Sequence, residues 1–151
     1  MKPIISATST PVWCGRLQRP YAFASPCGGR QFALLLVVGD EAVSVEEQSE
    51  LSEAFVRQGC RHAACYGHDC SSWDDSIDMV SVMDEVEGRS APFVMTTWHA
   101  DESLDEVVDF FAARARFDHW LPEAFVALVV GGPADLEAEV HAALARRFAA
   151  G

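Results

Sequence analysis

Four short apolar segments, each followed by a segment with helical periodicity, constrain the fold of this chain more than any other feature. Residues 32–38 (FALLLVV) are apolar without interruption, which is typical of a strand buried on both faces of a sheet. The other three apolar segments are 60–66, 92–98 and 124–130. Strands of this kind, alternating with helices, predict a parallel sheet covered by helices on both faces.

Helix signals separate and follow these segments. Ser44 and Glu47 have the spacing of a capping box, and Gly59 marks the end of that helix. The later helices are expected at about residues 72–87, 104–115 and 133–148.

We therefore expect a three-layer α/β/α fold of the Rossmann or flavodoxin type, with a four-stranded parallel sheet in a single domain at residues 32–151. With the strands numbered along the chain, right-handed crossovers favour the order 2-1-3-4, with 3-2-1-4 as the alternative. In the preferred order the switch point lies between strands one and three, and the crevice beyond their carboxyl ends is the expected ligand site. Residues 1–31 contain four prolines and no periodicity, and they predict an irregular arm or edge hairpin. This arm is either packed over the domain or a partly ordered terminus.

Charge is distributed unevenly along the chain. The net charge is −12, from 11 basic and 23 acidic side chains. Residues 1–39 carry four basic side chains and no acid, whereas residues 40–109 carry 18 acids and three arginines, a net charge of −15. This acidity argues against binding to nucleic acid or to an anionic membrane, because both require neutralisation by Lys and Arg. The positive arm is expected to dock on the acidic middle of the chain.

Several chemistries are disfavoured by composition. Lys2 is the only lysine, which argues against a P-loop and against Schiff-base chemistry. Neither a G-x-S-x-G elbow nor a G-x-G-x-x-G turn is present. An odd number of cysteines, five, predicts reduced thiols, and the lack of a signal-peptide pattern or long apolar run predicts a soluble, cytoplasmic protein. We predict no cofactor.

Two polar segments follow the second and third predicted strands, where the carboxyl ends of parallel strands bring side chains to one edge. The predicted ligand-binding residues are Asp40, His68, Asp69, Cys70, Trp73, Asp74, Thr97, Trp98 and His99. His68 and His99 lie beside carboxylates, a setting that suits a general base. The candidates for a catalytic role are these two histidines with Asp69 and Asp78.

Structural roles compete with this interpretation. Ser71 and Ser72 have the position of helix N-caps, and Asp74 and Asp75 would then be first-turn acids that the helix dipole favours. Taken singly, Trp73 and Trp98 are expected to be buried.

Two further chemistries stay open, although no metal is predicted. Imidazole and carboxylate ligands could come from separate loops, from His68, His99, Asp40, and Asp69 or Asp101. No H-x-H or H-E-x-x-H spacing supports such a site. Cys70 could act as a nucleophile with His99 as its base.

Two strings of residues carry a resemblance to a known family. The strings D-C-S-S-W-D-D-S at 69–76 and T-T-W-H-x-D-E at 96–102 resemble an uncharacterised bacterial family catalogued as a domain of unknown function. The similarity covers about residues 32–130, and Tyr66 departs from it where a tryptophan is expected. The resemblance implies a bacterial origin and one shared site built from both strings, without an established activity.

Two functions follow from these observations. The first is a small acidic binding domain whose polar site takes a small polar ligand or a cationic protein partner, as an accessory or immunity-type protein would. The alternative is a hydrolytic enzyme, nucleotide- or metal-dependent, that uses His99, His68 and an aspartate. One open pocket shared by the two histidines and Asp40 would favour the enzyme or a small ligand, whereas histidines that point apart would favour protein interaction. The oligomeric state is open.

Overall fold

One six-stranded sheet forms the centre of the protein, in the order β1-β2-β6-β3-β4-β5. The computed structural model describes residues 1–150. The strands are β1 (Lys2–Ile4), β2 (Val12–Leu17), β3 (Phe32–Val38), β4 (Cys60–Gly67), β5 (Met95–His99) and β6 (Ala124–Val130). The helices are α1 (Val45–Arg57), α2 (Cys70–Val86), α3 (Leu104–Arg114) and α4 (Ala134–Ala149). The expected α/β class is therefore confirmed.

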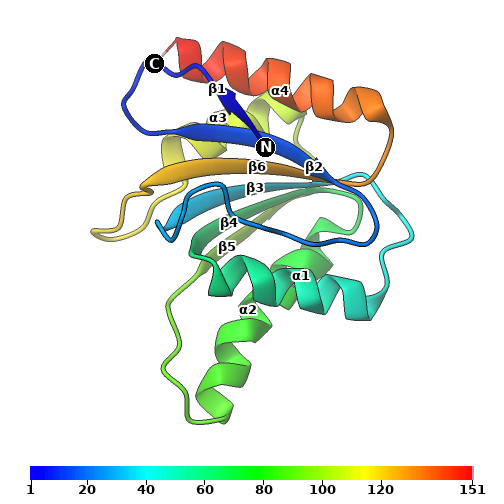
Figure 1. The fold of residues 1–151 in the computed structure, drawn as a ribbon, viewed down its shortest axis with the longest axis vertical. Coiled ribbons are helices and arrows are strands. Elements are labelled where there is room, and N and C mark those ends of the chain that lie inside the picture. The colour runs from blue at the N-terminus through cyan, green and yellow to red at the C-terminus, as the bar shows by residue number, and fades with distance from the viewer. Residues whose placement is uncertain (151) are drawn as a thin grey trace.

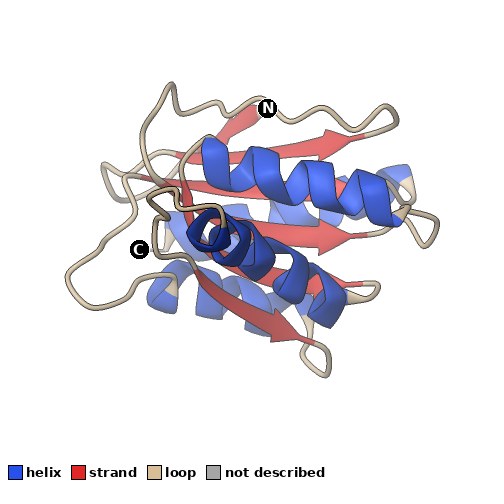
Figure 2. Ribbon diagram, turned by 90° about the horizontal axis from the view of Figure 1, so that it is seen from below, coloured by secondary structure: helices blue, strands red, loops and turns tan. Residues whose placement is uncertain are grey.

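Helices cover both faces of the sheet. Figure 1 shows α1 and α2 on one face and α3 and α4 on the other. Figure 2, viewed from the side of α1 and α2, shows the strands behind these helices. The second half of α2 extends beyond the sheet (Figure 1). Within residues 1–150, no helix combines the length and the apolar character that crossing a bilayer requires.

The strand order corrects the preferred sequence prediction. The order 2-1-3-4 is wrong, and the four expected strands follow the alternative 3-2-1-4, which places β6 beside β3. Both of these strands are buried along their whole length, so pairing them at the centre covers both faces of each. β5 carries Thr96 and Thr97 and lies at the edge of the sheet, where polar side chains cost less.

The expected number of strands is also wrong, because the segment expected to be an irregular arm or edge hairpin adds two strands to the sheet. β2 pairs in parallel with β6, and β1 pairs antiparallel with β2 at the edge. The following segment, residues 18–31, crosses to the face of α1 and contains no strand or helix. There the Phe23 ring packs edge-on against Phe55 with 5.1 Å between centroids. The arm is thus part of the core.

The helix starts differ in how well the capping signals predict them. At α1 the capping box is present: the Ser44 hydroxyl accepts from the Glu47 amide at 3.1 Å, and the Ser44 amide donates to the Glu47 carboxylate at 2.9 Å. At α2 the assignment of Ser71 and Ser72 as N-caps is wrong. Asp69, in the left-handed conformation with φ of 55°, precedes the helix, which begins at Cys70. Asp74 consequently lies beyond the first turn and is buried against the sheet.

Candidate functional site

The switch point of the sheet lies between β3 and β6. The expected position, between strands one and three, is wrong because β4 separates those two strands. The chain leaves β3 through Gly39 and β6 through Gly131 and Gly132, and these backbones approach closely. A Cβ on Gly132, whose φ is +78°, would lie 2.9 Å from the Gly39 Cα. The usual ligand crevice of an open α/β sheet is therefore closed by glycine contacts at its base.

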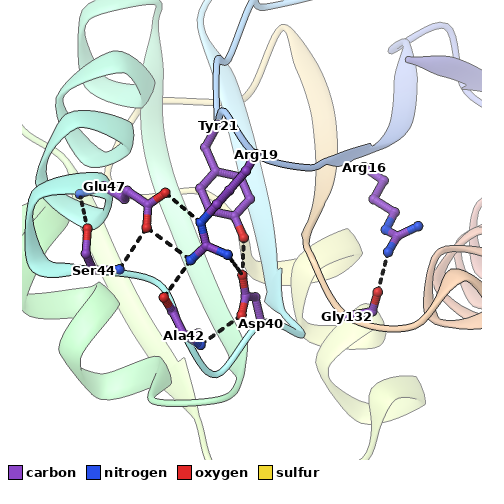
Figure 3. Close-up of polar contacts among 8 residues, drawn as sticks. All are labelled: Arg16, Arg19, Tyr21, Asp40, Ala42, Ser44, Glu47 and Gly132. Carbon is purple, nitrogen blue, oxygen red and sulfur yellow. Dashed lines mark hydrogen bonds and ion pairs between the residues drawn. The ribbon is translucent and has the colours of Figure 1, made fainter.

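Side chains from the arm fill the mouth of this crevice (Figure 3). The Arg19 guanidinium donates to both oxygens of Glu47, at 2.9 and 3.2 Å, and lies 3.2 Å from Asp40. It also donates to the Ala42 carbonyl and lies 5.3 Å from the centre of the Tyr21 ring. All three guanidinium nitrogens are thereby engaged, and the paired contact with Glu47 is the geometry in which Arg recognises a carboxylate best.

Tyr21 completes this network and perturbs its titration. The Tyr21 hydroxyl donates to Asp40, and this hydrogen bond is the main cause that lowers the pKa of Asp40. Partial burial, followed by the hydrogen bond to Asp40, raises the pKa of Tyr21 to about 12. The hydrogen bond from Arg19 lowers the pKa of Glu47. On the far side of the crevice, Arg16 donates to the Gly132 carbonyl (Figure 3). At neutral pH the network holds two carboxylates, one phenol and one guanidinium in fixed positions.

A small pocket of about 110 Å³ opens beside this network. Four of the residues expected to bind a ligand line this pocket, namely Asp40, His68, Asp69 and Trp73. Glu41, which was not among the expected residues, lines it as well. His68 and Asp69 are exposed, whereas Trp73 is buried at 2% exposure, as expected. Within residues 1–150, Glu41 and Asp69 form no ion pair, so this pocket presents unneutralised carboxylates.

The pocket continues into a groove between α1 and α2. The groove has a volume of about 550 Å³, and it shares Val45, Gln48 and Ser72 with the small pocket. Its walls carry Glu53, Asp75 and Glu87 beside apolar side chains that include Met79 and Met83. Arg57 and Arg89 also line it and pair with Glu53 and Glu87, so Asp75 is the acid among these three without an ion pair in the described chain. We call the small pocket and the groove together the acidic edge.

Asp74 and Asp78 lie elsewhere, between α2 and the edge strand β5. The Thr96 hydroxyl donates to Asp78 at 2.9 Å. Asp74 is 5% exposed, and one of its carboxylate oxygens has no hydrogen-bond partner in the described chain. Burial, reinforced by the charges of Asp78 and Asp75, raises the pKa of Asp74. Trp98 is 56% exposed, so its expected burial is wrong; as the register partner of Cys65 it lies on an edge strand that has no outer neighbour.

A third group lies on the opposite face of β5, under α3. The Thr97 hydroxyl is 2.9 Å from His99 Nε2, and His99 Nδ1 is 2.9 Å from the Glu102 carboxylate. His99 is 5% exposed and packs on Phe110 with 4.6 Å between ring centroids. Burial, and to a lesser degree the charge of His99, lowers the pKa of the neighbouring His62 to about 4.

Strand geometry explains why the expected residues divide into three groups. Successive side chains of a strand point to opposite faces, so Thr96 and Thr97 cannot serve the same site. The structure brings Asp40, His68, Asp69 and Trp73 together but places His99 with Thr97 under α3. One shared site for both histidines is therefore not what the fold builds.

Two alternatives for this site fail for the same reason. Cys70 is buried in the core beneath α1 and α2, on the other side of the sheet from His99, so the proposed pairing of thiol and base is wrong. Within residues 1–150, no three His, Cys, Asp or Glu side chains are grouped so that they could hold a metal ion. The ligand set drawn from His68, His99, Asp40, and Asp69 or Asp101 is thus not assembled.

Several residues of these groups were not expected from the sequence. They are Arg19, Tyr21, Glu47, Glu102 and His62. The contrast between a basic arm and an acidic middle was the available signal for Arg19, and it indicated docking without indicating the partner residues. Glu102 stands three residues after His99, and this spacing is the sequence signal for their contact.

Comparison with known proteins adds a family. No curated protein matches the chain. A family model described as a domain of unknown function, DUF7684, matches residues 12–147, which confirms the resemblance to an uncharacterised domain family. The match includes β2 and the whole of α1 and α2, so the arm network and the acidic edge both lie within the family domain. The chain belongs to the DUF7684 family, a domain of unknown function.

Proposed function

We propose that this chain is a binding module that recognises a cationic protein partner at the acidic edge. One observation carries the proposal: directly beside the small pocket, the chain already binds a guanidinium of its own, that of Arg19, through Glu47, Asp40 and a backbone carbonyl. Next to this internal cation, the pocket of Glu41 and Asp69 offers carboxylates without ion-pair partners in the described chain. A partner's Arg or Lys would be bound there by the same chemistry.

The charge pattern supports this proposal over a wider surface. The net charge of −15 in residues 40–109 includes the acids of α1, α2 and α3. A field of one sign speeds the approach of an oppositely charged partner and disfavours partners of like charge. An accessory or immunity-type role fits such a module. The proposed compartment is the cytoplasm, where thiols stay reduced; all five cysteines are free.

A defined cationic probe tests the proposal. The probe is a fluorescent, flexible peptide of Gly, Ser and Arg, compared with the same peptide carrying Glu in place of Arg. We expect the Arg peptide to bind the protein, as measured by fluorescence anisotropy at low salt, and the Glu peptide not to bind. The double variant Glu41→Gln/Asp69→Asn should weaken binding about fivefold, because two exposed charges contribute roughly 1 kcal/mol together.

The matched control separates the site from bulk charge. Asp135→Asn/Glu139→Gln on α4 removes the same number of exposed acids on the other face of the sheet. When the titration is repeated at physiological salt, where the Debye length is about 8 Å, this variant should change the affinity less than about twofold, because α4 lies across the sheet from α1 and α2. Equal weakening in both double variants would show nonspecific attraction and would overturn the proposal.

A second candidate function is supported by the group under α3. Thr97, His99 and Glu102 follow the order hydroxyl, imidazole, carboxylate with two contacts of 2.9 Å. This is the arrangement in which a base activates a hydroxyl nucleophile and an acid orients the base. A hydrolytic enzyme that acts on an ester would form an acyl-Thr97 intermediate with loss of the alcohol, and water would then release the acid. Compared with the expectation from sequence, it keeps His99 but uses neither His68 nor an aspartate.

Ester hydrolysis distinguishes this candidate from the binding module. The assay follows release of p-nitrophenol from p-nitrophenyl acetate by the wild type, Thr97→Val and His99→Gln. A rate that falls at least about a hundredfold in both variants would support hydrolysis, since general-base assistance alone contributes that much. Equal rates in all three proteins would leave Thr97, His99 and Glu102 as an anchor for the edge strand.

A further inference from the structure

The second half of α2 carries an apolar stripe that is exposed to solvent and that adjoins the groove between α1 and α2. Its members are Met79, Val82, Met83 and Val86, which are 49%, 49%, 44% and 72% exposed. Their spacing of three, four and seven residues places all four on one face of the helix. In Figure 1 this half of α2 projects away from the sheet. We call these four residues the α2 stripe.

The α2 stripe is presented on a helix that is fixed in place. Asp84, whose side chain is 1% exposed, accepts from both terminal nitrogens of Arg57 on α1, at 2.6 Å each. It also accepts from Arg89, just beyond the helix, at 3.0 Å. Nearer the start of both helices, the hydroxyl oxygens of Ser52 on α1 and Ser76 on α2 are 2.8 Å apart and form a hydrogen bond. The projecting turns of α2 are therefore tied to α1 and keep one orientation.

Exposed acids lie beside the stripe and restrict what can cover it. Asp75, Asp78 and Glu85 are exposed neighbours on α2, and Glu87 follows the helix. Of these four, Glu87 alone has a basic partner within the described chain, Arg89 at 2.7 Å. A second copy of this protein would bring the same acids against these, in addition to a charge of −12 on each copy. Like charges across an interface disfavour such a pairing by as much as several kcal/mol.

We propose that the α2 stripe binds an amphipathic basic helix of the partner protein. The inference rests on the proposed function for the cationic nature of the partner. It adds that the bound segment of the partner is a helix and that this helix lies on the α2 stripe. The apolar face of the helix would cover the stripe, and Lys and Arg at its margins would meet Asp75, Asp78 and Glu85. Two methionines suit this role because their flexible side chains adapt to the shape of a docked helix.

Peptides of matched composition test the form of the partner segment. One peptide of about 14 residues, roughly 21 Å as a helix, carries Leu at helical spacing and Lys or Arg elsewhere. A second has the same residues in an order that destroys the apolar face. We expect the amphipathic peptide to bind at least about tenfold more tightly than the scrambled one, because only the first can bury its leucines on the stripe.

Variants of the stripe test its place. Val82→Ser/Met83→Ser should weaken binding of the amphipathic peptide at least about tenfold, as loss of central apolar anchors does at interfaces. Ile5→Ser/Leu121→Ser, which removes two exposed apolar side chains elsewhere, should leave the affinity within about twofold. All four positions are exposed, so the variants should keep the wild-type circular dichroism spectrum and melting temperature. The milder Met83→Gln should give an intermediate affinity.

Each result separates this inference from the proposed function. Equal affinity for both peptides, or unchanged affinity in Val82→Ser/Met83→Ser, would overturn the helix inference. If Glu41→Gln/Asp69→Asn still weakened both peptides in that case, the cationic partner would stand. Sedimentation that shows a dimer in the wild type and a monomer in Val82→Ser/Met83→Ser would assign the stripe to a second copy and overturn the inference as well.

Discussion

The two helical layers of this protein use their apolar residues differently. On one face of the sheet, α4 buries Val140, Leu144 and Phe148, and Phe148 packs on Phe125 with 5.0 Å between ring centroids. On the other face, α2 buries Trp73 and Ile77 in its first half but exposes the α2 stripe in its second. The layer of α3 and α4 thus stabilises the sheet, whereas the layer of α1 and α2 also presents a surface. Apolar periodicity alone does not tell these roles apart.

The largest expected effect on the free energy of unfolding comes from a substitution in the layer of α3 and α4. Leu144→Ala removes a fully buried side chain from α4 and should lower the free energy of unfolding by about 2–5 kcal/mol. Urea denaturation followed by circular dichroism measures this change. Binding of the cationic peptide by the folded variant should be unchanged, because α4 lies on the opposite face of the sheet. A loss below about 0.5 kcal/mol would contradict the assignment of α4 to the core.

A somewhat smaller effect is expected from pH at the same layer. Because the pKa of buried His62 is lowered to about 4, the folded protein favours its neutral form. In the unfolded chain the pKa of this histidine is about 6.5, so protons bind the unfolded state more readily than the folded state. The free energy of unfolding is therefore highest above pH 6.5 and falls by about 3 kcal/mol in total as the pH drops toward 4. His62→Gln, which does not titrate, should show a shallower fall of stability between these pH values. Identical slopes in the two proteins would contradict the account of His62.

The layer of α1 and α2 should respond to stronger acid. The hydrogen bonds from Arg57, followed by those from Arg89, lower the pKa of Asp84 to about 2. Stabilisation by this carboxylate is present above its unfolded pKa of about 4 and is lost as the pH falls from there to about 2. Asp84→Asn should reduce stability at pH 7 and flatten the curve below pH 4 only. If Asp84→Asn instead changed the pH dependence of the free energy of unfolding above pH 5, the assignment of the strongly acidic transition to Asp84 would be contradicted.

The smallest expected effect on stability is at the α2 stripe. Val82→Ser and Met83→Ser should each lower the free energy of unfolding by no more than about 1 kcal/mol, because about half of each side chain is already exposed to solvent. The same measurement on Val140→Ser of α4 provides the comparison and should give a loss several times larger. A loss above about 2 kcal/mol at the stripe would mean that it packs within the protein.

Much of the fold was predictable because the central strands are continuous runs of apolar residues that the sequence shows directly. β3 and β6 are continuous apolar runs, and their burial on both faces follows directly. The strand order was less accessible, although the two threonines of β5 indicate an edge position. β2 was missed because Gly15 and Arg16 interrupt a short segment that pairs with residues more than a hundred positions later. Such pairing has no local signal.

The site was predicted in part, and the error has a geometric cause. Asp40, His68, Asp69 and Trp73 meet because loops that follow neighbouring parallel strands share an edge. His99 does not join them, since alternation along β5 sends its side chain under α3. The role of Arg19 depended on the path of a segment without periodicity. Residues 18–31 have no secondary structure from which that path could have been inferred.

Amide chemical-shift mapping tests the central claim most directly. The isotope-labelled protein is titrated with the basic amphipathic peptide, and shift changes are assigned along the chain. A cationic partner bound at the acidic edge and the α2 stripe should shift the amides of α1, α2 and the loops after β3 and β4, and leave those of α4 unchanged. Shifts centred on α4 or spread evenly over the surface would contradict the account.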